Sequence, residues 1–147
     1  MFYRILIPVL LLCISCSIEP VPIEYNVDLC DNCKMIIANE RFGAELVTTK
    51  GRAYKFDALE CLLPMLKENG PDHYKYILAT DYTNARKFIE AEKATYLISK
   101  DLPSPMGAFL SAYSDPEEAE KMKGVKGGKI YTWKELQSVD LFGHIDY

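Results

Sequence analysis

The sequence predicts an α+β protein built from two ββαβ repeats, each a small sheet with one helix. Three observations support this fold class. Short alternating segments, typical of strands, occur in both halves of the chain. In each half an acidic helix start follows the second strand, after YKF in one and after LSAY in the other. A further strand follows each helix, so the repeats are placed at about 27–82 and 83–147.

In the first repeat, a hairpin is expected over residues 44–56. The segment AELVTT alternates, a two-residue Lys-Gly turn follows, and RAYKF continues as the second strand. Asp57 is expected to cap a helix, with Glu60 completing a capping box. Four leucines at helical spacing give this helix an apolar face, and Gly70 ends it. Residues 75–80 (KYILAT) form the expected third strand.

The second repeat shows the same order. Asp115, followed by Pro116 and two glutamates, predicts a helix start, and Gly124 is expected to end that helix. The other expected elements are strands over 96–100, 107–113 and 129–131 and a last helix over 132–138, capped by Thr132 and Glu135.

Residues 1–15 are expected to be a signal peptide, because one arginine precedes an apolar run too short to span a bilayer. Ser15 and Cys16 then resemble a bacterial lipobox, which implies that the Cys16 thiol carries a lipid. Residues 16–26 would be a tether and 27–147 the folded domain. The alternative is an ordinary cleaved signal with an incidental cysteine. The lipoprotein interpretation places the protein in the cell envelope, anchored to a membrane and facing the periplasm, with the outer membrane compatible.

Composition excludes some classes of function. The apolar content of 49% and the charged content of 26% are typical of a globular protein. The net charge of −4 and the lack of a basic run argue against a nucleic-acid partner.

Three cysteines remain beyond the lipobox: Cys30, Cys33 and Cys61. An odd number of cysteines in an oxidising compartment does not make a disulfide framework. Cys30, Cys33 and Met35 together form a short cluster of soft donors. Thiolate and thioether ligands select Cu(I), whereas methionine is a poor zinc ligand. If the backbone from Cys33 to Met35 is extended, both sulfurs point to the same side.

Two further sulfurs are candidate ligands. Met106 lies in the stiff segment 103–107 (PSPMG), where a ligand is expected more than a core filler. Cys61 lies on the first expected helix, where a buried apolar thiol is an equally good interpretation.

The motifs CDNCKMII and KFDALECLL, with SPMGAFLSAY in the second half, resemble the NosL family of copper-binding lipoproteins over about residues 28–136. The resemblance implies a two-repeat fold shared with organomercurial lyase. It also implies delivery of Cu(I) to nitrous oxide reductase, with an ABC-transporter complex as a further partner. The implied copper ligands are Cys33, Met35 and Met106, with Cys30 and Cys61 as additional candidates. Family members usually have glycine where this chain has Lys34.

Three other functions compete with copper delivery. Cys30 and Cys33 could act as a thiol-disulfide oxidoreductase, but they precede the first hairpin rather than open a helix after a strand. Cys33 and Cys61 could cleave carbon–metal bonds as a lyase, although a shared fold does not carry function. The chain could also be a structural lipoprotein with a Cys30–Cys33 disulfide. We expect a metal-binding protein that is not an enzyme.

Overall fold

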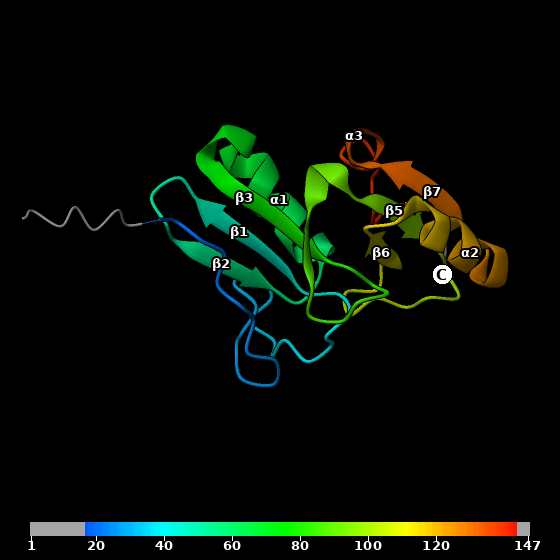
Figure 1. Ribbon diagram of the computed structural model, residues 1–147, viewed down its shortest axis with the longest axis horizontal. Helices are drawn as coiled ribbons and strands as arrows, with labels where there is room; N and C mark the ends of the chain where they lie inside the picture. The colour runs from blue at the N-terminus through cyan, green and yellow to red at the C-terminus, as the bar shows by residue number, and fades with distance from the viewer. Residues whose placement is uncertain (1–16, 144–147) are drawn as a thin grey trace, which may run out of the picture.

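The computed structural model describes residues 17–143, so the expected signal peptide and Cys16 lie outside the described part. A first unit and a second unit follow each other along the chain (Figure 1). The first contains β1 (Ala44–Thr48), β2 (Ala53–Phe56), α1 (Leu59–Asn69), β3 (Tyr74–Thr80) and β4 (Phe88–Glu90). The second contains β5 (Thr95–Ile98), β6 (Leu110–Tyr113), α2 (Pro116–Lys126), β7 (Lys129–Thr132) and α3 (Trp133–Leu136). Short 3₁₀ turns precede β3 and β5.

Each unit forms its own antiparallel sheet around its first strand. The strand order is β2-β1-β3-β4 in the first sheet and β6-β5-β7 in the second. In both, the hairpin partner lies on one side of the first strand and the strand after the helix lies on the other. The predicted pair of ββαβ units is therefore confirmed, with β4 and α3 as additions.

The start of α1 differs from the prediction. Its N-cap is Ala58, without a side-chain cap, so the capping box of Asp57 and Glu60 is wrong. Both acidic side chains are buried and take part in tertiary contacts instead. The Asp57 carboxylate accepts the backbone N–H of Ala38, and the Glu60 carboxylate accepts the hydroxyl of Ser104.

Other elements also begin or end at residues different from those predicted. The hairpin loop has three residues, because the Thr48 N–H bonds the carbonyl of Arg52 at 2.8 Å and Gly51 takes a left-handed φ of 87°. Helix α2 passes Gly124 and ends at Gly127, whose N–H bonds the carbonyl of Lys123. The strand expected from residue 107 begins only at Leu110.

Two predicted helix caps are confirmed. The Asp115 side chain accepts the N–H of Glu117 at the start of α2. The capping box of Thr132 and Glu135 opens α3, which is shorter than the helix expected over 132–138.

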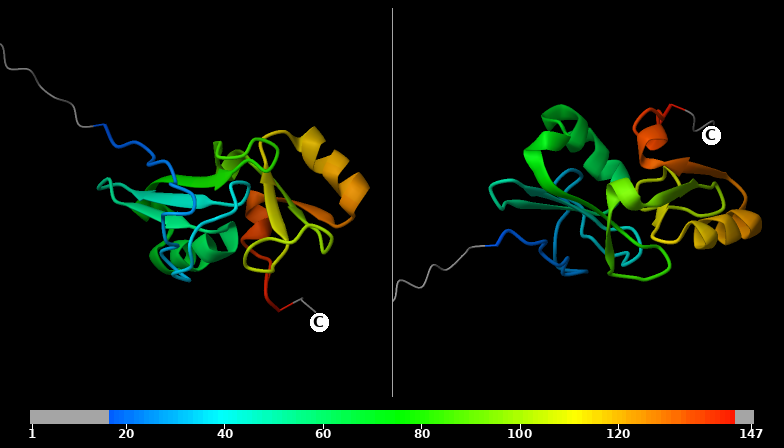
Figure 2. Two further views of the ribbon diagram at one scale, coloured as in Figure 1. Left: turned by 90° about the horizontal axis from the view of Figure 1, so that it is seen from below. Right: turned by 45° about the horizontal axis from the view of Figure 1, so that its top comes forward.

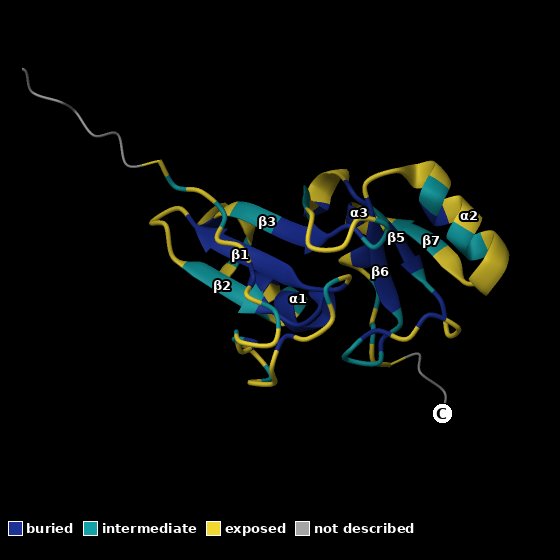
Figure 3. Ribbon diagram, turned by 60° about the horizontal axis from the view of Figure 1, so that its bottom comes forward, coloured by how far each residue is buried: buried dark blue, intermediate teal, exposed yellow. Residues whose placement is uncertain are grey.

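One hydrophobic core runs through both units, so the two sheets are packed as one body (Figure 3). Its fully buried members include Leu46, Phe56 and Leu62 from the first unit and Tyr96 and Leu110 from the second. A smaller cluster lies under α2, whose outer face is exposed.

Asp81, just after β3, joins the two sheets. It forms an isolated parallel bridge with Ala112 of β6, and its carboxylate accepts hydrogen bonds from Thr83, Asn84 and Ser114. Burial by itself would raise the pKa of Asp81, but these hydrogen bonds outweigh it and hold the pKa below its usual value. The junction therefore carries a buried, ionised carboxylate with several donors.

The described N-terminal segment packs along the first sheet (Figure 2). The N–H of Val21 bonds the buried carboxylate of Glu45 at 2.8 Å, and Ile23 is buried in the core. Packing therefore begins ahead of residue 27. Among residues 17–143, no helix is long and apolar enough to cross a membrane.

We expect Asp81→Ala to lower the free energy of unfolding by about 2 kcal/mol, because it removes a buried carboxylate that accepts several hydrogen bonds at the junction of the sheets. Urea denaturation measures this loss. Asp115→Ala is the matched control, since it removes only an exposed helix cap and should cost about 1 kcal/mol. Equal losses in the two variants would show that Asp81 does not hold the sheets together.

Candidate metal centre

Three cysteine thiols meet beside the N-terminus of α1. The sulfur atoms of Cys30, Cys33 and Cys61 all lie within 4.8 Å of one another, and all three thiols are free. Cys30 and Cys61 are buried, whereas Cys33 is partly exposed. The fold thus brings two thiols of one loop to a third thiol on a helix about thirty residues later in the chain.

The loop that carries Cys30 and Cys33 is closed by its own backbone. Leu29 and Ile36 form an isolated antiparallel bridge, and the Cys30 N–H bonds the carbonyl of Met35 at 2.8 Å. The N–H of Lys34 bonds the carbonyl of Cys30, and Lys34 takes a left-handed φ of 63°. The backbone from Cys33 to Met35 is therefore not extended, and the same-side geometry expected for those two sulfurs does not apply.

Contacts with β2 hold this loop against the first sheet. The N–H of Asp31 bonds the carbonyl of Lys55, and the N–H of Lys55 bonds the carboxylate of Asp31, each at 2.8 Å. The Lys55 ammonium group also pairs with Asp28 at 2.6 Å. Because β2 leads directly into α1, these contacts fix the loop relative to Cys61.

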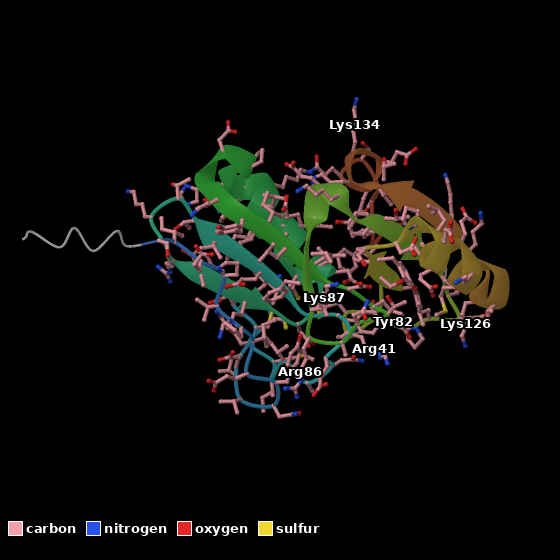
Figure 4. The ribbon with its side chains drawn as sticks, in the orientation of Figure 1. Arg41, Tyr82, Arg86, Lys87, Lys126 and Lys134 are labelled. Carbon is pink, nitrogen blue, oxygen red and sulfur yellow. The ribbon has the colours of Figure 1, made fainter. Side chains whose placement is uncertain are left out.

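A second set of contacts holds the chain that follows the loop (Figure 4). The Arg41 guanidinium donates to the carbonyl of Tyr82 and lies over its ring at 5.4 Å. The Arg86 N–H bonds the carbonyl of Glu40, and its guanidinium lies over the ring of Tyr25. The thiol loop is thus bonded to β2 through Asp31, and the chain that follows the loop is bonded to the connection after β3.

Cys30 is surrounded by hydrogen-bond donors. Its sulfur accepts the S–H of Cys61 and backbone N–H groups of Asp57, Cys33 and Asn32. The bond from Cys61, helped by the backbone donors, outweighs burial and lowers the pKa of Cys30 from its ordinary value of 9.0 to about 5. The pKa of Cys61 is raised, first because its S–H donates a hydrogen bond to Cys30 and then because the thiol is buried. The pair therefore holds one thiolate and one thiol at neutral pH.

The backbone N–H of Asp57 stabilises the Cys30 thiolate, while the carboxyl group of Asp57 is itself disfavoured as a second negative charge. Burial raises the pKa of its carboxyl group, and the negative charge of Cys30 raises it further. The N–H of Ala38 acts in the opposite direction. The site therefore favours negative charge on sulfur over negative charge on the neighbouring carboxyl group.

The two candidate methionines differ in their surroundings. Met106 is partly buried and packs against the same core cluster that contains Cys30 and Cys61. Met35 is 52% exposed, and its neighbours Ile36 and Leu29 are exposed as well. The structure therefore gathers the three cysteines, packs Met106 against the hydrophobic core that Cys30 and Cys61 share, and leaves Met35 on the surface.

A family model for NosL matches residues 20–141. The chain belongs to the NosL family. Among solved structures, it is similar to the crystal structure of the copper chaperone NosL from Shewanella denitrificans, with a TM-score of 0.70 and 22% sequence identity. That match covers 81% of this chain and 96% of the other, and at this identity it shows a shared fold. The comparison with curated proteins finds no match.

The NosL resemblance singled out position 34, where glycine is usual, and the structure supplies a reason. Lys34 has a positive φ, a conformation that glycine adopts without the clash that a Cβ atom introduces. One contributor to the site is not apparent in the sequence: the backbone N–H of Asp57. Its place four residues before Cys61 in KFDALEC is the only local sign, and the same residues fit a capping box.

We expect Lys34→Gly to raise the free energy of unfolding by about 0.5–1 kcal/mol. Glycine removes the strain of the left-handed backbone from the folded protein. It also makes the unfolded chain more flexible, which is unfavourable for folding, but this second effect is the smaller one. Thermal and urea unfolding of the metal-free protein measure the change. Lys50→Gly is the control, because Lys50 is an exposed loop lysine without a positive φ. That change should lower stability by about 0.5 kcal/mol. A loss in both variants would contradict the strain at Lys34.

We expect the thiolate of Cys30 to stabilise the metal-free fold in a pH-dependent way. Its folded pKa of about 5 lies below the ordinary 9.0, so the stabilisation is complete above the unfolded pKa and is lost as pH falls through the folded pKa. The stability difference between wild type and Cys30→Ser should therefore shrink from pH ~9 to pH ~5. Ultraviolet thiolate absorbance provides the second measurement. Its appearance only near the ordinary thiol pKa would contradict the low value.

Proposed function

We propose that this protein is a Cu(I) chaperone of the cell envelope rather than an enzyme, and that Cys30, Cys33 and Cys61 bind its copper. The observation that carries the proposal is the meeting of three free thiols within 4.8 Å, with one of them accessible from the surface. Membership of the NosL family supports it, since a solved structure of the same fold is that of a copper chaperone.

The donor set favours Cu(I) over the competing metals. Thiolate and thioether sulfurs select Cu(I), which is stable with two or three ligands. Structural zinc sites take four ligands, and no histidine or carboxylate within residues 17–143 joins the three thiols. The existing thiolate of Cys30 supplies one deprotonated ligand before the metal arrives, because metal binding requires thiolates.

The ligands would have different roles. Cys30 and Cys61 are buried and give the site its fixed part, so Cys30 takes a larger part than the sequence suggested. Cys33 is the ligand that an incoming donor can replace. Met106 packs against the hydrophobic core that contains Cys30 and Cys61, and it is proposed as a thioether ligand from the second unit. Met35 is exposed and is proposed to receive copper during entry and release.

Delivery requires an anchor, a recipient and a surface on which they meet. We propose that Cys16 carries a lipid and holds the protein at the periplasmic side of a membrane. The proposed recipient is a copper enzyme, nitrous oxide reductase, with an ABC-transporter complex as a further partner. Four exposed apolar side chains surround the thiol loop and provide a surface for such a recipient: Val27, Leu29, Met35 and Ile36.

An anaerobic competition titration with a Cu(I) chelator tests the site. We expect Cys33→Ser or Cys61→Ser to weaken Cu(I) binding at least about a hundredfold, because each removes a thiolate. Met106→Leu, a nearly isosteric change, should weaken it about tenfold without lowering the melting temperature. Met122→Leu, at a methionine near the smaller cluster under α2, is the control and should leave the affinity unchanged.

Wild-type protein that binds no copper would overturn the proposal. Reduction of insulin disulfides by such metal-free protein would support the oxidoreductase alternative instead.

A further inference from the structure

Glu60 is a buried carboxylate that the fold does not explain by itself. Its side chain is 1% exposed, and one carboxylate oxygen accepts the hydroxyl of Ser104. The other oxygen has no hydrogen-bond partner in the described chain. Burying a carboxylate with incomplete pairing is unfavourable, so an apolar residue would stabilise this position better. Glu60 precedes Cys61, a proposed copper ligand, in the sequence.

Its partner Ser104 organises the loop that contains Met106. The Ser104 hydroxyl oxygen accepts the N–H of Phe109 at 2.9 Å, and the Ser104 carbonyl accepts the N–H of Gly107 at 3.0 Å. Met106 therefore lies inside a loop that Gly107 and Phe109 close by bonding back to Ser104. The Ser104 hydroxyl connects this loop of the second unit to α1 of the first.

The same loop is strained. Gly107 has a φ of 77° and Phe109 has a φ of 60°. Glycine adopts this left-handed conformation freely, but a bulky residue such as Phe109 does so only where surrounding contacts enforce it. The hydrogen bond from the Phe109 N–H to Ser104 is one such contact, and Glu60 fixes the orientation of the Ser104 hydroxyl.

We propose that Glu60 is a positioning residue of the copper site: through Ser104 it fixes the conformation of the loop that carries Met106 and so sets the affinity for Cu(I). This inference rests on the proposed function, in which Met106 is a ligand. It assigns the buried carboxylate a purpose in metal binding that a hydrophobic side chain could not serve, because only an acceptor can fix the Ser104 hydroxyl.

The test compares Glu60→Leu with Glu60→Gln. Gln keeps an acceptor for Ser104 and should bind Cu(I) within about twofold of wild type, whereas Leu should weaken binding about tenfold, as is typical of residues that orient metal ligands. The melting temperature of the metal-free Leu variant should not fall, since a poorly paired buried carboxylate is removed. A purely structural residue would lower stability and affinity together.

Glu45→Leu is the matched control. Glu45 is also a buried carboxylate of the first sheet with one oxygen lacking a partner among the described residues, but it bonds Val21 rather than the Met106 loop. Its replacement should leave Cu(I) affinity unchanged.

A double-mutant cycle with Met106→Leu makes the test specific. If Glu60 acts through Met106, Glu60→Leu should have no further effect on Cu(I) affinity once Met106 is Leu. Equal losses in both backgrounds, or an unchanged affinity in Glu60→Leu, would overturn the inference. If Glu60→Leu does not fold, Ser104→Ala takes its place in the cycle with Met106→Leu, because it removes the same hydrogen bond.

Hydrogen exchange of the Phe109 amide separates this inference from the proposed function. Protection should be lost in Glu60→Leu and kept in Glu60→Gln, with or without copper. Wild-type protein that binds no Cu(I) would refute the chaperone proposal and, with it, the effect of Glu60 on affinity. Protection equal in all three proteins would refute the positioning role whatever the protein binds.

Discussion

The first turn of α1 is the constraint on which the rest of the site depends. Asp57, just before the helix, donates a backbone N–H to Cys30, and the first turn itself presents the thiol of Cys61 and accepts the hydroxyl of Ser104 from the second unit. The helix has no side-chain cap, and the lack of a cap lowers stability by about 1 kcal/mol at an ordinary helix start. The stability lost at the helix end is offset by contacts that join a loop, a helix and the other sheet.

Negative charge on sulfur is stabilised here by the S–H of Cys61 and by backbone N–H groups rather than by a cationic side chain. Backbone donors are held by the fold and do not have to be recruited when the metal binds, so the site is organised before copper arrives. A metal ion entering such a site meets a thiolate that already exists, and fewer protons must leave at neutral pH. This arrangement suits a protein that has to take up and give away the same ion.

The sequence was sufficient for the order of elements and insufficient for the site. Alternation, leucine spacing and turn residues are local, so they predicted two ββαβ units correctly. Asp57 and Glu60 fit a local capping pattern, but both side chains bond residues distant in the sequence instead of capping the helix. Spacing also suggested an extended Cys33–Met35 segment, which the left-handed Lys34 rules out. The approach of Cys61 to the other thiols depends on chain folding, for which no local pattern exists.

The bond between Val21 and Glu45 sets how far the domain could move from a membrane. The exposed Lys75 ammonium group of β3 already bonds the Ile18 carbonyl at 2.7 Å, but the bond to the buried Glu45 is the first to a buried side chain of the sheet. If Cys16 bears the lipid, five residue steps separate the anchor from the Val21 N–H. Fully extended, that stretch reaches at most about 18 Å, at roughly 3.5 Å per residue. The domain would then remain within about two Debye lengths of the lipid headgroups at physiological ionic strength. Encounters with a recipient would be searches along the plane of the bilayer rather than through the volume of the compartment.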